Sequence, residues 1–149
     1  MTVPLSDYRS WGGLAARSGT IVDARDWLDT PASYRPALPY GNGRSYGDSC
    51  LNNGGTLIDA RGLDEILAFD RETGLITCGA GLLLDRLLEI VVPAGWFPPV
   101  TPGTAFVTIG GALANDVHGK NHHSAGTFGC HVRAFELVRS DGQHRICAP

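Results

Sequence analysis

The glycines of this chain gather in two windows, and that grouping constrains its backbone more than any other feature. Glycine accounts for 20 of the 149 residues, well above the usual share of about 7%. The first window holds Gly41, Gly43, Gly47, Gly54 and Gly55, and the second holds Gly103, Gly110, Gly111, Gly119, Gly126 and Gly129. Both windows interrupt apolar stretches, so they indicate tight turns and close backbone approach rather than a flexible chain.

Length, charge and cysteine usage set the class of protein. The chain is long enough for one domain with a sizeable core, and its formal net charge of −3 argues against nucleic-acid partners. Charged residues are spread through residues 1–30, and no apolar run reaches the length of a membrane span. Because Cys50, Cys78, Cys130 and Cys147 form no CxxC pair, we expect free thiols and a soluble, cytoplasmic protein with no transmembrane segment.

The apolar spacing predicts an α+β fold. Alternating or continuous apolar runs predict a buried strand over 56–60 and hairpins over 66–80 and 134–148. The i, i+3, i+4, i+7 stripe that begins at Leu84 and ends at Val91 predicts an amphipathic helix. Small residues over 107–116 suit a short helix.

A change of composition near residue 62 divides the expected domain. We expect a small N-terminal α/β lobe over about residues 1–62. A second lobe, over about residues 63–149, is expected to carry a larger mixed or antiparallel sheet with flanking helices. Together these form one domain over residues 1–149.

The stretch GNGRSYGDS, at the start of the first window, has the composition of a phosphate-binding turn. Glycine amides without side chains around them can point at an anion, Arg44 adds a positive charge, and Ser45 adds a hydroxyl. An ordinary tight turn remains the alternative. A Rossmann fingerprint is excluded because Tyr46 stands where the third glycine of GxGxxG belongs.

The second window, TPGTAFVTIGGALANDVHGKNHHSAGTFGCH, also provides a surface of small and hydroxyl side chains. Backbone packing alone could explain Gly110, Gly111 and Ala112. Two such stretches about sixty residues apart favour one extended ligand that carries a pyrophosphate, such as a dinucleotide. Gly119 and Lys120 match the glycine and lysine near the end of the P-loop motif GxxxxGK(S/T). The remaining positions of this stretch do not match that motif.

Potential metal ligands also lie in the second window: Asp116, His118, His122, His123, Cys130 and His131. The i, i+4 spacing of His118 and His122 would need a helix, and Gly119 stands where HExxH requires glutamate. We expect no metal site and interpret the histidines as side chains that hydrogen-bond in polar loops or line a polar pocket.

Both glycine windows resemble the FAD-binding domain of the vanillyl-alcohol-oxidase, or PCMH-type, flavoproteins. They are most similar to the decaprenylphosphoryl-β-D-ribose 2-oxidase group of FAD-linked oxidases. The likeness extends over roughly residues 5–149 and includes the whole of PGTAFVTIGGALANDVHGKNHHSAGTFGCHVRAFELVRSDG. It implies a PCMH-type FAD-binding domain in a flavoprotein oxidoreductase.

The resemblance implies two sets of FAD-binding residues. The first surrounds the pyrophosphate: Gly41, Asn42, Gly43, Arg44, Ser45, Tyr46 and Gly47. The second lines the flavin and phosphates: Pro102, Gly103, Thr104, Val107, Thr108, Gly110, Gly111, Ala112, Asn115, Val117, His118 and Gly119. Asn115 stands where the group has a cysteine, and Tyr46 stands where many relatives attach FAD through a histidine. We therefore expect non-covalent FAD.

The resemblance also implies a reaction and its partners. A sugar or polyol hydroxyl, on a phosphorylated or lipid-linked sugar, would be oxidised with hydride transfer to FAD. His118 and Lys120 are the substrate-side candidates, although Lys120 also suits a solvated surface. Because family members are longer and a C-terminal substrate or cap domain is absent here, two alternatives remain. One is a non-catalytic FAD- or nucleotide-binding fragment, and the other is half of a split enzyme that needs a partner chain or self-associates.

Overall fold

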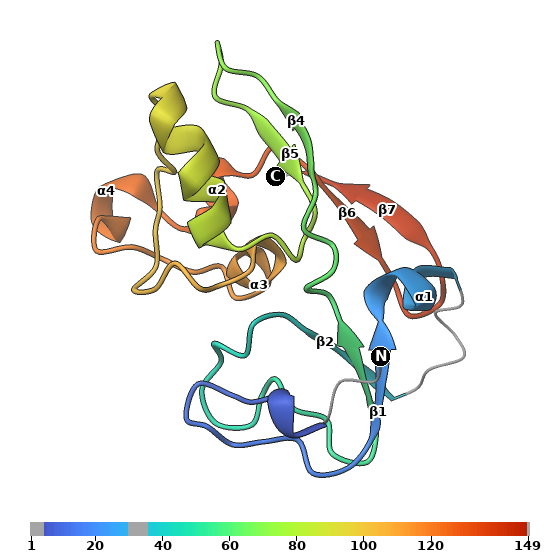
Figure 1. The fold of residues 1–149 in the computed structure, drawn as a ribbon. Helices are drawn as coiled ribbons and strands as arrows, with labels where there is room; N and C mark the ends of the chain where they lie inside the picture. The colour runs from blue at the N-terminus through green and yellow to red at the C-terminus, as the bar shows by residue number, and fades with distance from the viewer. Residues whose placement is uncertain (1–4, 30–35, 149) are drawn as a thin grey trace. The chain divides into compact units, whose positions relative to one another are not determined.

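The computed structural model describes residues 5–29 and 36–148. Helices and strands mix along the chain in the order drawn in Figure 1, which confirms the predicted α+β class. The chain divides into two compact units, Met1–Gly62 with Val138–His144 and Leu63–Leu137 with Arg145–Pro149. Within the described residues, no helix is both long and apolar enough to cross a membrane.

The first unit is built on a three-stranded parallel sheet with the strand order β1-β3-β2. The strands are β1 (Thr20–Asp23), β2 (Ala37–Tyr40) and β3 (Thr56–Asp59). The central strand β3 has three buried residues in a row, as expected for a parallel strand covered on both faces. β3 was predicted, whereas β1 and β2 were not; Pro39 is tolerated because β2 is an edge strand.

Short helices and an aromatic pair complete the first unit. A single 3-10 turn, η1 (Leu5–Asp7), precedes the sheet, and α1 (Ala24–Asp29) follows β1. Tyr8 and Tyr40 meet edge to face with ring centroids 5.0 Å apart, and they pack with Leu57 in the core. The loop that leaves Tyr40 therefore begins from a rigid, buried residue.

The second unit combines a hairpin with the amphipathic helix. β4 (Ile66–Phe69) and β5 (Ile76–Cys78) pair antiparallel, as predicted. Helix α2 (Leu84–Val91) buries Leu84, Leu87 and Val91, which are members of the predicted stripe. A 3-10 turn, η3 (Val92–Ala94), ends the helix at Gly95.

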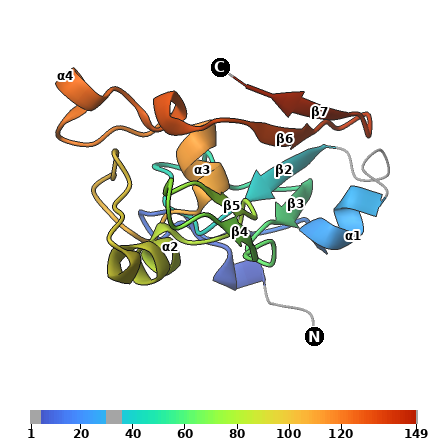
Figure 2. The same cartoon turned by 90° about the horizontal axis from the view of Figure 1, so that it is seen from above.

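Three short helical segments and a last hairpin follow. They are α3 (Ile109–Ala114), α4 (His122–Ala125) and η4 (Phe128–His131), then β6 (Phe135–Val138) and β7 (His144–Cys147). The two strands of this hairpin lie side by side in Figure 2. Both the short helix within 107–116 and the hairpin within 134–148 were predicted from the sequence.

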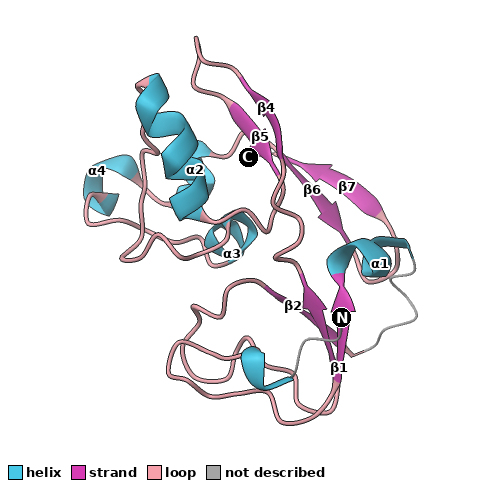
Figure 3. Ribbon diagram, viewed as in Figure 1, coloured by secondary structure: helices cyan, strands magenta, loops and turns pink. Residues whose placement is uncertain are grey.

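The larger sheet expected in the second lobe is not formed by the described residues. They form two separate two-stranded sheets, β4-β5 and β6-β7. The reason is that residues 79–134 contribute no strand between these hairpins. Helices and loops rich in proline and glycine occupy that segment, as Figure 3 shows.

Candidate FAD-binding site

The first glycine window is the loop that follows β2, and two glycines give it its shape. Gly43 and Gly47 have φ angles of +61° and +60°, which L side chains rarely adopt. Gly43 is buried, whereas Arg44, Tyr46 and Gly47 are exposed, Tyr46 to 81%. The loop is therefore anchored at Gly43 and open to solvent at its far end.

A partly buried network of charged and aromatic groups lies next to the start of this loop. Tyr40 and Asp59 end neighbouring strands in register. Arg61 binds Asp59 through two nitrogens, with Nε 2.9 Å from Oδ1 and Nη2 2.6 Å from Oδ2. The Tyr8 hydroxyl donates to Asp59 Oδ2 at 2.8 Å. The Arg61 guanidinium lies 4.9 Å from the Tyr8 ring centroid and 5.6 Å from that of Tyr40.

The pKa values of this network follow from its contacts. Burial raises the pKa of Tyr8 to about 12, and its bond to Asp59 acts in the same direction. Burial alone would raise the pKa of Asp59, but the hydrogen bonds from Arg61 and Tyr8 outweigh it and hold that pKa below its ordinary value. The bond to Asp59 raises the pKa of Arg61. The network therefore keeps one ion pair and one neutral phenol beneath the loop.

Arg44 gives the loop of residues 41–47 a positive charge. Its Nη1 donates to the Asn42 carbonyl at 2.7 Å, and its guanidinium lies 5.6 Å from the Trp11 ring centroid. The Ser45 carbonyl accepts a hydrogen bond from Trp11 N at 3.0 Å. These contacts give the loop a defined cation and leave its exposed turn accessible to an anion.

The second window contains the N-terminus of α3. Thr108 is buried, and its Oγ1 accepts a hydrogen bond from Gly111 N at 3.2 Å, which caps the helix. Gly110 N donates to the Ala80 carbonyl at 2.8 Å. A Cβ built on Gly110 would lie 2.9 Å from Ala80 Cβ. Ala112 is fully buried, so the small side chains of this helix serve close packing inside the unit.

Residues 102–107 form the loop that leads into α3. Thr104 Oγ1 accepts from Phe106 N at 3.2 Å, and the Val107 carbonyl accepts from Leu84 N at 2.9 Å. Pro102 is half-buried, whereas Gly103 is exposed and an added Cβ would meet no atom within 4 Å. Gly103 is thus one position where a ligand can approach the backbone.

The segment after α3 returns along that helix. Asn115 is exposed, and its Nδ2 donates to the Gly111 carbonyl at 2.8 Å. Val117 N donates to the Ala112 carbonyl at 3.0 Å. His118 forms an isolated bridge with Thr127, and Gly119 is buried after it. The side chain of Asn115 therefore caps the C-terminus of α3.

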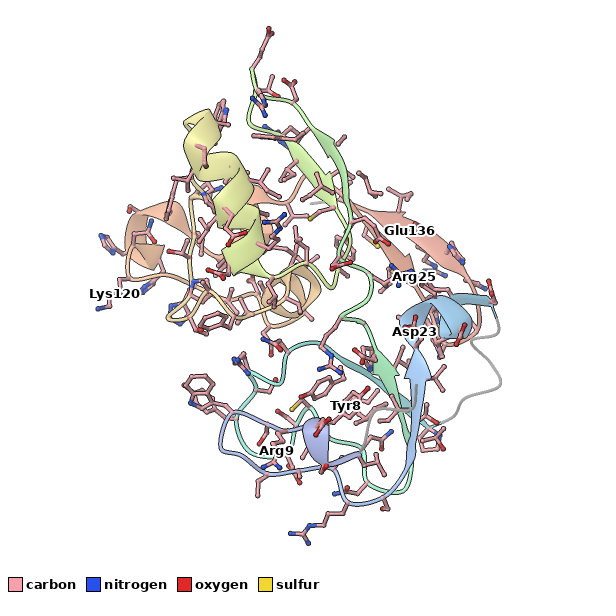
Figure 4. All side chains as sticks on the ribbon, viewed as in Figure 1. Tyr8, Arg9, Asp23, Arg25, Lys120 and Glu136 are labelled. Atoms are coloured by element: carbon pink, nitrogen blue, oxygen red, sulfur yellow. The ribbon has the colours of Figure 1, made fainter. Side chains whose placement is uncertain are left out.

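An open hollow of about 990 Å³ lies in the second unit. Five sequence candidates line it: Pro102, Gly103, His118, Gly119 and Lys120. The other lining residues are Phe97, Pro98, Pro99, Thr101, Asn121 and His122. Lys120 is exposed and its side chain extends away from the ribbon in Figure 4. Phe97, Pro98 and Pro99 were not predicted as lining residues, because no local sequence pattern indicates that they face the hollow.

The histidines cluster by ring contact. His118 and His122 have ring centroids 5.1 Å apart, and those of His122 and His123 are 6.1 Å apart. Nδ1 of His118 and Nδ1 of His122 both lie within hydrogen-bonding reach of the Gly119 carbonyl, at 3.4 and 3.3 Å. In the part of the chain that the structure describes, no three metal-binding side chains group as metal ligands would.

The glycines provide a test of whether a dinucleotide fits these segments. Added Cβ atoms on Gly43 and Gly110 would collide with protein atoms, so these glycines serve the fold. Added Cβ atoms on Gly47 and Gly103 would meet nothing within 4 Å. Each window therefore exposes bare backbone at one glycine or more, and the first also holds an arginine, which suits a dinucleotide with a pyrophosphate.

These features define an α+β domain with two glycine-rich segments. The family model described as the FAD binding domain matches residues 21–148. The chain belongs to this FAD-binding family, and its cofactor is FAD. The resemblance noted in the two glycine windows is confirmed.

Three relatives show the range of proteins that contain such a domain. The chain is 48% identical over 115 residues to decaprenylphosphoryl-beta-D-ribose oxidase of Mycolicibacterium smegmatis, which covers 77% of this chain and 25% of that protein. It is 30% identical over 114 residues to D-lactate dehydrogenase of Anaerostipes hadrus, covering 76% and 22% respectively. It is 31% identical over 87 residues to a probable mitochondrial D-2-hydroxyglutarate dehydrogenase of Oryza sativa subsp. indica, covering 58% and 16%.

The chain therefore spans about a quarter, or less, of the length of these relatives. Their names describe one oxidase and two dehydrogenases. What the family match shows for this chain is the FAD-binding domain itself.

Proposed function

We propose that this chain binds FAD non-covalently and serves an oxidoreductase that oxidises the hydroxyl of a sugar or polyol. The observation that carries the proposal is the hollow whose lining joins Gly103 to His118 and Lys120. It combines open backbone, a proton acceptor and a cation within one unit. The relative that is 48% identical is named for a decaprenylphosphoryl ribose, which is a phosphorylated, lipid-linked sugar.

The two lining side chains have distinct chemistry. The imidazole of His118 is suited to accept the proton of a substrate hydroxyl, because an unprotonated ring nitrogen carries a free lone pair. The exposed ammonium of Lys120 is suited to bind a phosphate on the substrate. When bound, FAD supplies the acceptor for the hydride.

The binding roles of the two windows follow from their backbones. In the first unit, the amides of residues 41–47 are suited to the pyrophosphate, with Arg44 as a countercharge. In the second unit, residues 102–112 are suited to the flavin, and the segment 115–119 continues toward the substrate hollow. We also propose that residues 1–62 and 63–149 are two lobes of one PCMH-type domain.

The mode of FAD attachment is tested by a spectrum. Tyr46 is a phenol at the position where many relatives carry the linking histidine, so we expect no covalent bond. The purified chain is loaded with FAD, its visible absorption is recorded, and the protein is precipitated with acid. Flavin in the supernatant supports the proposal, and flavin retained in the pellet overturns it.

The substrate class is tested by binding to the FAD-loaded chain. A sugar phosphate, the matching unphosphorylated sugar and a 2-hydroxy acid are titrated against wild type, Lys120→Ala and the surface control Arg86→Ala, which does not line the hollow. Weaker binding of the sugar phosphate alone in Lys120→Ala supports a phosphorylated sugar. Preferred binding of the 2-hydroxy acid would assign the chain to the chemistry named for its dehydrogenase relatives instead.

A second candidate function is an FAD-binding module that needs a partner chain for catalysis. It is supported by the family match, which concerns the binding of FAD and names no substrate. The FAD-loaded chain is mixed with the remaining portion of the oxidase relative, and flavin reduction by the sugar is followed. Reduction only in the mixture supports this second candidate.

A further inference from the structure

A short N-terminal hairpin, residues 8–16, lies against the first glycine loop and outside the family match, which begins at residue 21. Its two arms pair through Ser10 N to the Leu14 carbonyl at 2.9 Å and Ala16 N to the Tyr8 carbonyl at 2.9 Å. A turn closes it, with Gly13 N donating to the Ser10 carbonyl at 3.0 Å. Tyr8 and Arg9, on the first arm, are labelled in Figure 4.

The Tyr40 hydroxyl joins this hairpin to the start of the loop. It accepts from Arg9 N at 2.9 Å and donates to the Arg9 carbonyl at 2.7 Å. Tyr40 is 3% exposed, so both bonds form away from solvent. One phenol therefore pairs both backbone groups of Arg9, which gives this contact a fixed geometry.

Gly43 fits against the same point of the hairpin. A Cβ on Gly43 would overlap the Arg9 carbonyl and would lie 2.5 Å from the Tyr40 hydroxyl. The left-handed turn at Gly43 thus brings the loop backbone directly onto Arg9. No larger residue could occupy this position without moving one of the two segments.

Trp11 supplies the third contact. Its backbone N–H donates to the Ser45 carbonyl at 3.0 Å, and its ring lies under the Arg44 guanidinium at 5.6 Å. The hairpin therefore touches the loop at residues 43, 44 and 45, in the middle of the segment proposed to bind the pyrophosphate.

We propose that the hairpin of residues 8–16 is a clamp that holds the loop of residues 41–47 in its anion-binding conformation before FAD arrives. Arg9, Trp11 and Tyr40 are positioning residues, which act on FAD through the loop. A loop ordered in advance loses less conformational freedom on binding, so the clamp raises affinity without contacting the cofactor. The inference rests on the proposed pyrophosphate role of the loop.

The test uses variants that remove the clamp contacts one at a time. Trp11→Pro removes the N–H and the ring, and proline suits this position because Trp11 is the second residue of the turn closed by Ser10 and Gly13. Trp11→Ala removes only the ring. Tyr40→Phe removes only the hydroxyl and serves if Trp11→Pro fails to fold.

Gly12→Ala is the matched control. It lies in the same turn, has no positive φ, and an added Cβ would meet nothing within 4 Å. Gly47→Ala changes the loop itself without touching the hairpin, since its own added Cβ would also meet nothing within 4 Å.

Two readouts separate the clamp from a merely structural role. The first is amide hydrogen exchange of residues 41–47 in the FAD-free chain, measured where every variant is folded. The second is the dissociation constant for FAD and for ADP, which carries the pyrophosphate without the flavin. Riboflavin, which lacks the pyrophosphate, is the ligand control.

We expect faster loop exchange in Trp11→Pro and Tyr40→Phe, with weaker FAD and ADP binding by about tenfold and unchanged riboflavin binding. Trp11→Ala should weaken FAD binding by about threefold, and Gly12→Ala should match wild type. Wild-type exchange and affinity in both Trp11→Pro and Tyr40→Phe would overturn the clamp. A lower unfolding temperature with unchanged affinity and loop exchange would also overturn it.

The outcome for Gly47→Ala distinguishes this inference from the proposed function. If Gly47→Ala binds FAD and ADP as wild type does, the pyrophosphate role of the loop is wrong, and with it the effect of the clamp on affinity. If Gly47→Ala loses affinity while the clamp variants keep it, the loop role stands and the clamp inference fails.

Discussion

The two glycine windows use the same residue for different physical reasons. In the first window, Gly43 combines a φ of +61° with a packed environment, because the Arg9 carbonyl occupies the space of a Cβ. In the second window, Gly110 lies in the helix α3 without a positive φ. There the neighbouring Ala80 leaves no room for a larger side chain. The first glycine is needed for a backbone angle and a close contact, the second for the contact alone.

The comparison also separates glycines that the fold requires from glycines that leave the backbone open to a ligand. Each window has glycines that pack against protein, such as Gly43 or Gly110, and at least one that faces open space, such as Gly47 or Gly103. Substitution of the first kind should affect stability, and substitution of the second kind should affect the cofactor. A glycine-rich motif is therefore a mixture of two requirements, which variants can resolve.

The largest effect is expected for Gly43→Ala. Its left-handed φ and its overlap with the Arg9 carbonyl should together lower the free energy of unfolding by about 3 kcal/mol. Urea denaturation measures this loss. The matched variant Gly47→Ala shares the positive φ without the overlap and should lose about 1 kcal/mol. Equal losses in the two variants would mean that the contact with Arg9 does not matter.

The network beneath the first window predicts a loss of stability at high pH. The folded state raises the pKa of Tyr8 to about 12 through burial first and its bond to Asp59 second. A raised pKa stabilises the fold fully below the unfolded pKa of about 10. That contribution, about 2 to 3 kcal/mol, is then lost as the pH rises through the folded value. Urea denaturation across this range should show a shallower pH slope in Tyr8→Phe, and an unchanged slope would contradict the prediction.

Gly110→Ala tests the contact requirement in the second window. Alanine gains helix propensity of about 1 kcal/mol, but its Cβ would lie 2.9 Å from Ala80 Cβ and should cost more than that gain. We expect a net loss of about 1 to 2 kcal/mol. The double variant with Ala80→Gly should recover part of it in a double-mutant cycle, and strictly additive losses would refute the contact.

The helix cap in the second window predicts a smaller effect. Thr108→Ala removes the oxygen that accepts from Gly111 N and should lower the free energy of unfolding by about 1 kcal/mol. Thr108→Ser keeps that oxygen and should retain most of the stability in thermal denaturation. Equal losses in the two variants would show that the methyl group, rather than the cap, is what matters.

The smallest effect on stability is expected for Gly103→Ala. This glycine has open space around it, so the unfolding free energy should change by less than about 0.5 kcal/mol. The FAD dissociation constant, measured by flavin fluorescence, should rise because the new methyl group occupies the cofactor's approach. Unchanged FAD affinity would place Gly103 outside the cofactor site.

Much of the fold could be predicted from local patterns. The stripe from Leu84 to Val91 predicted α2, because one face of a helix must be apolar to pack. The apolar run over 56–60 predicted β3. β1 and β2 were missed; Pro39 weakens the strand signal of β2, whereas β1 has the same length and a similar pattern to the predicted β3.

The candidate site was predicted in part. The two glycine windows and their likeness to an FAD-binding family were visible in the sequence. The wall of the hollow formed by Phe97, Pro98 and Pro99 was not, because nothing local to those residues indicates that they face His118. The N-terminal clamp was missed for the same reason.

The sequence by itself determined the class of this protein, since glycine spacing, apolar periodicity and family motifs are all properties of neighbouring residues. Only the tertiary structure decided what each glycine is for. Gly43 and Gly47 are four residues apart and share a φ near +60°, yet only Gly43 meets Arg9. That difference depends on atoms more than thirty residues away along the chain, which the folded backbone alone brings into contact.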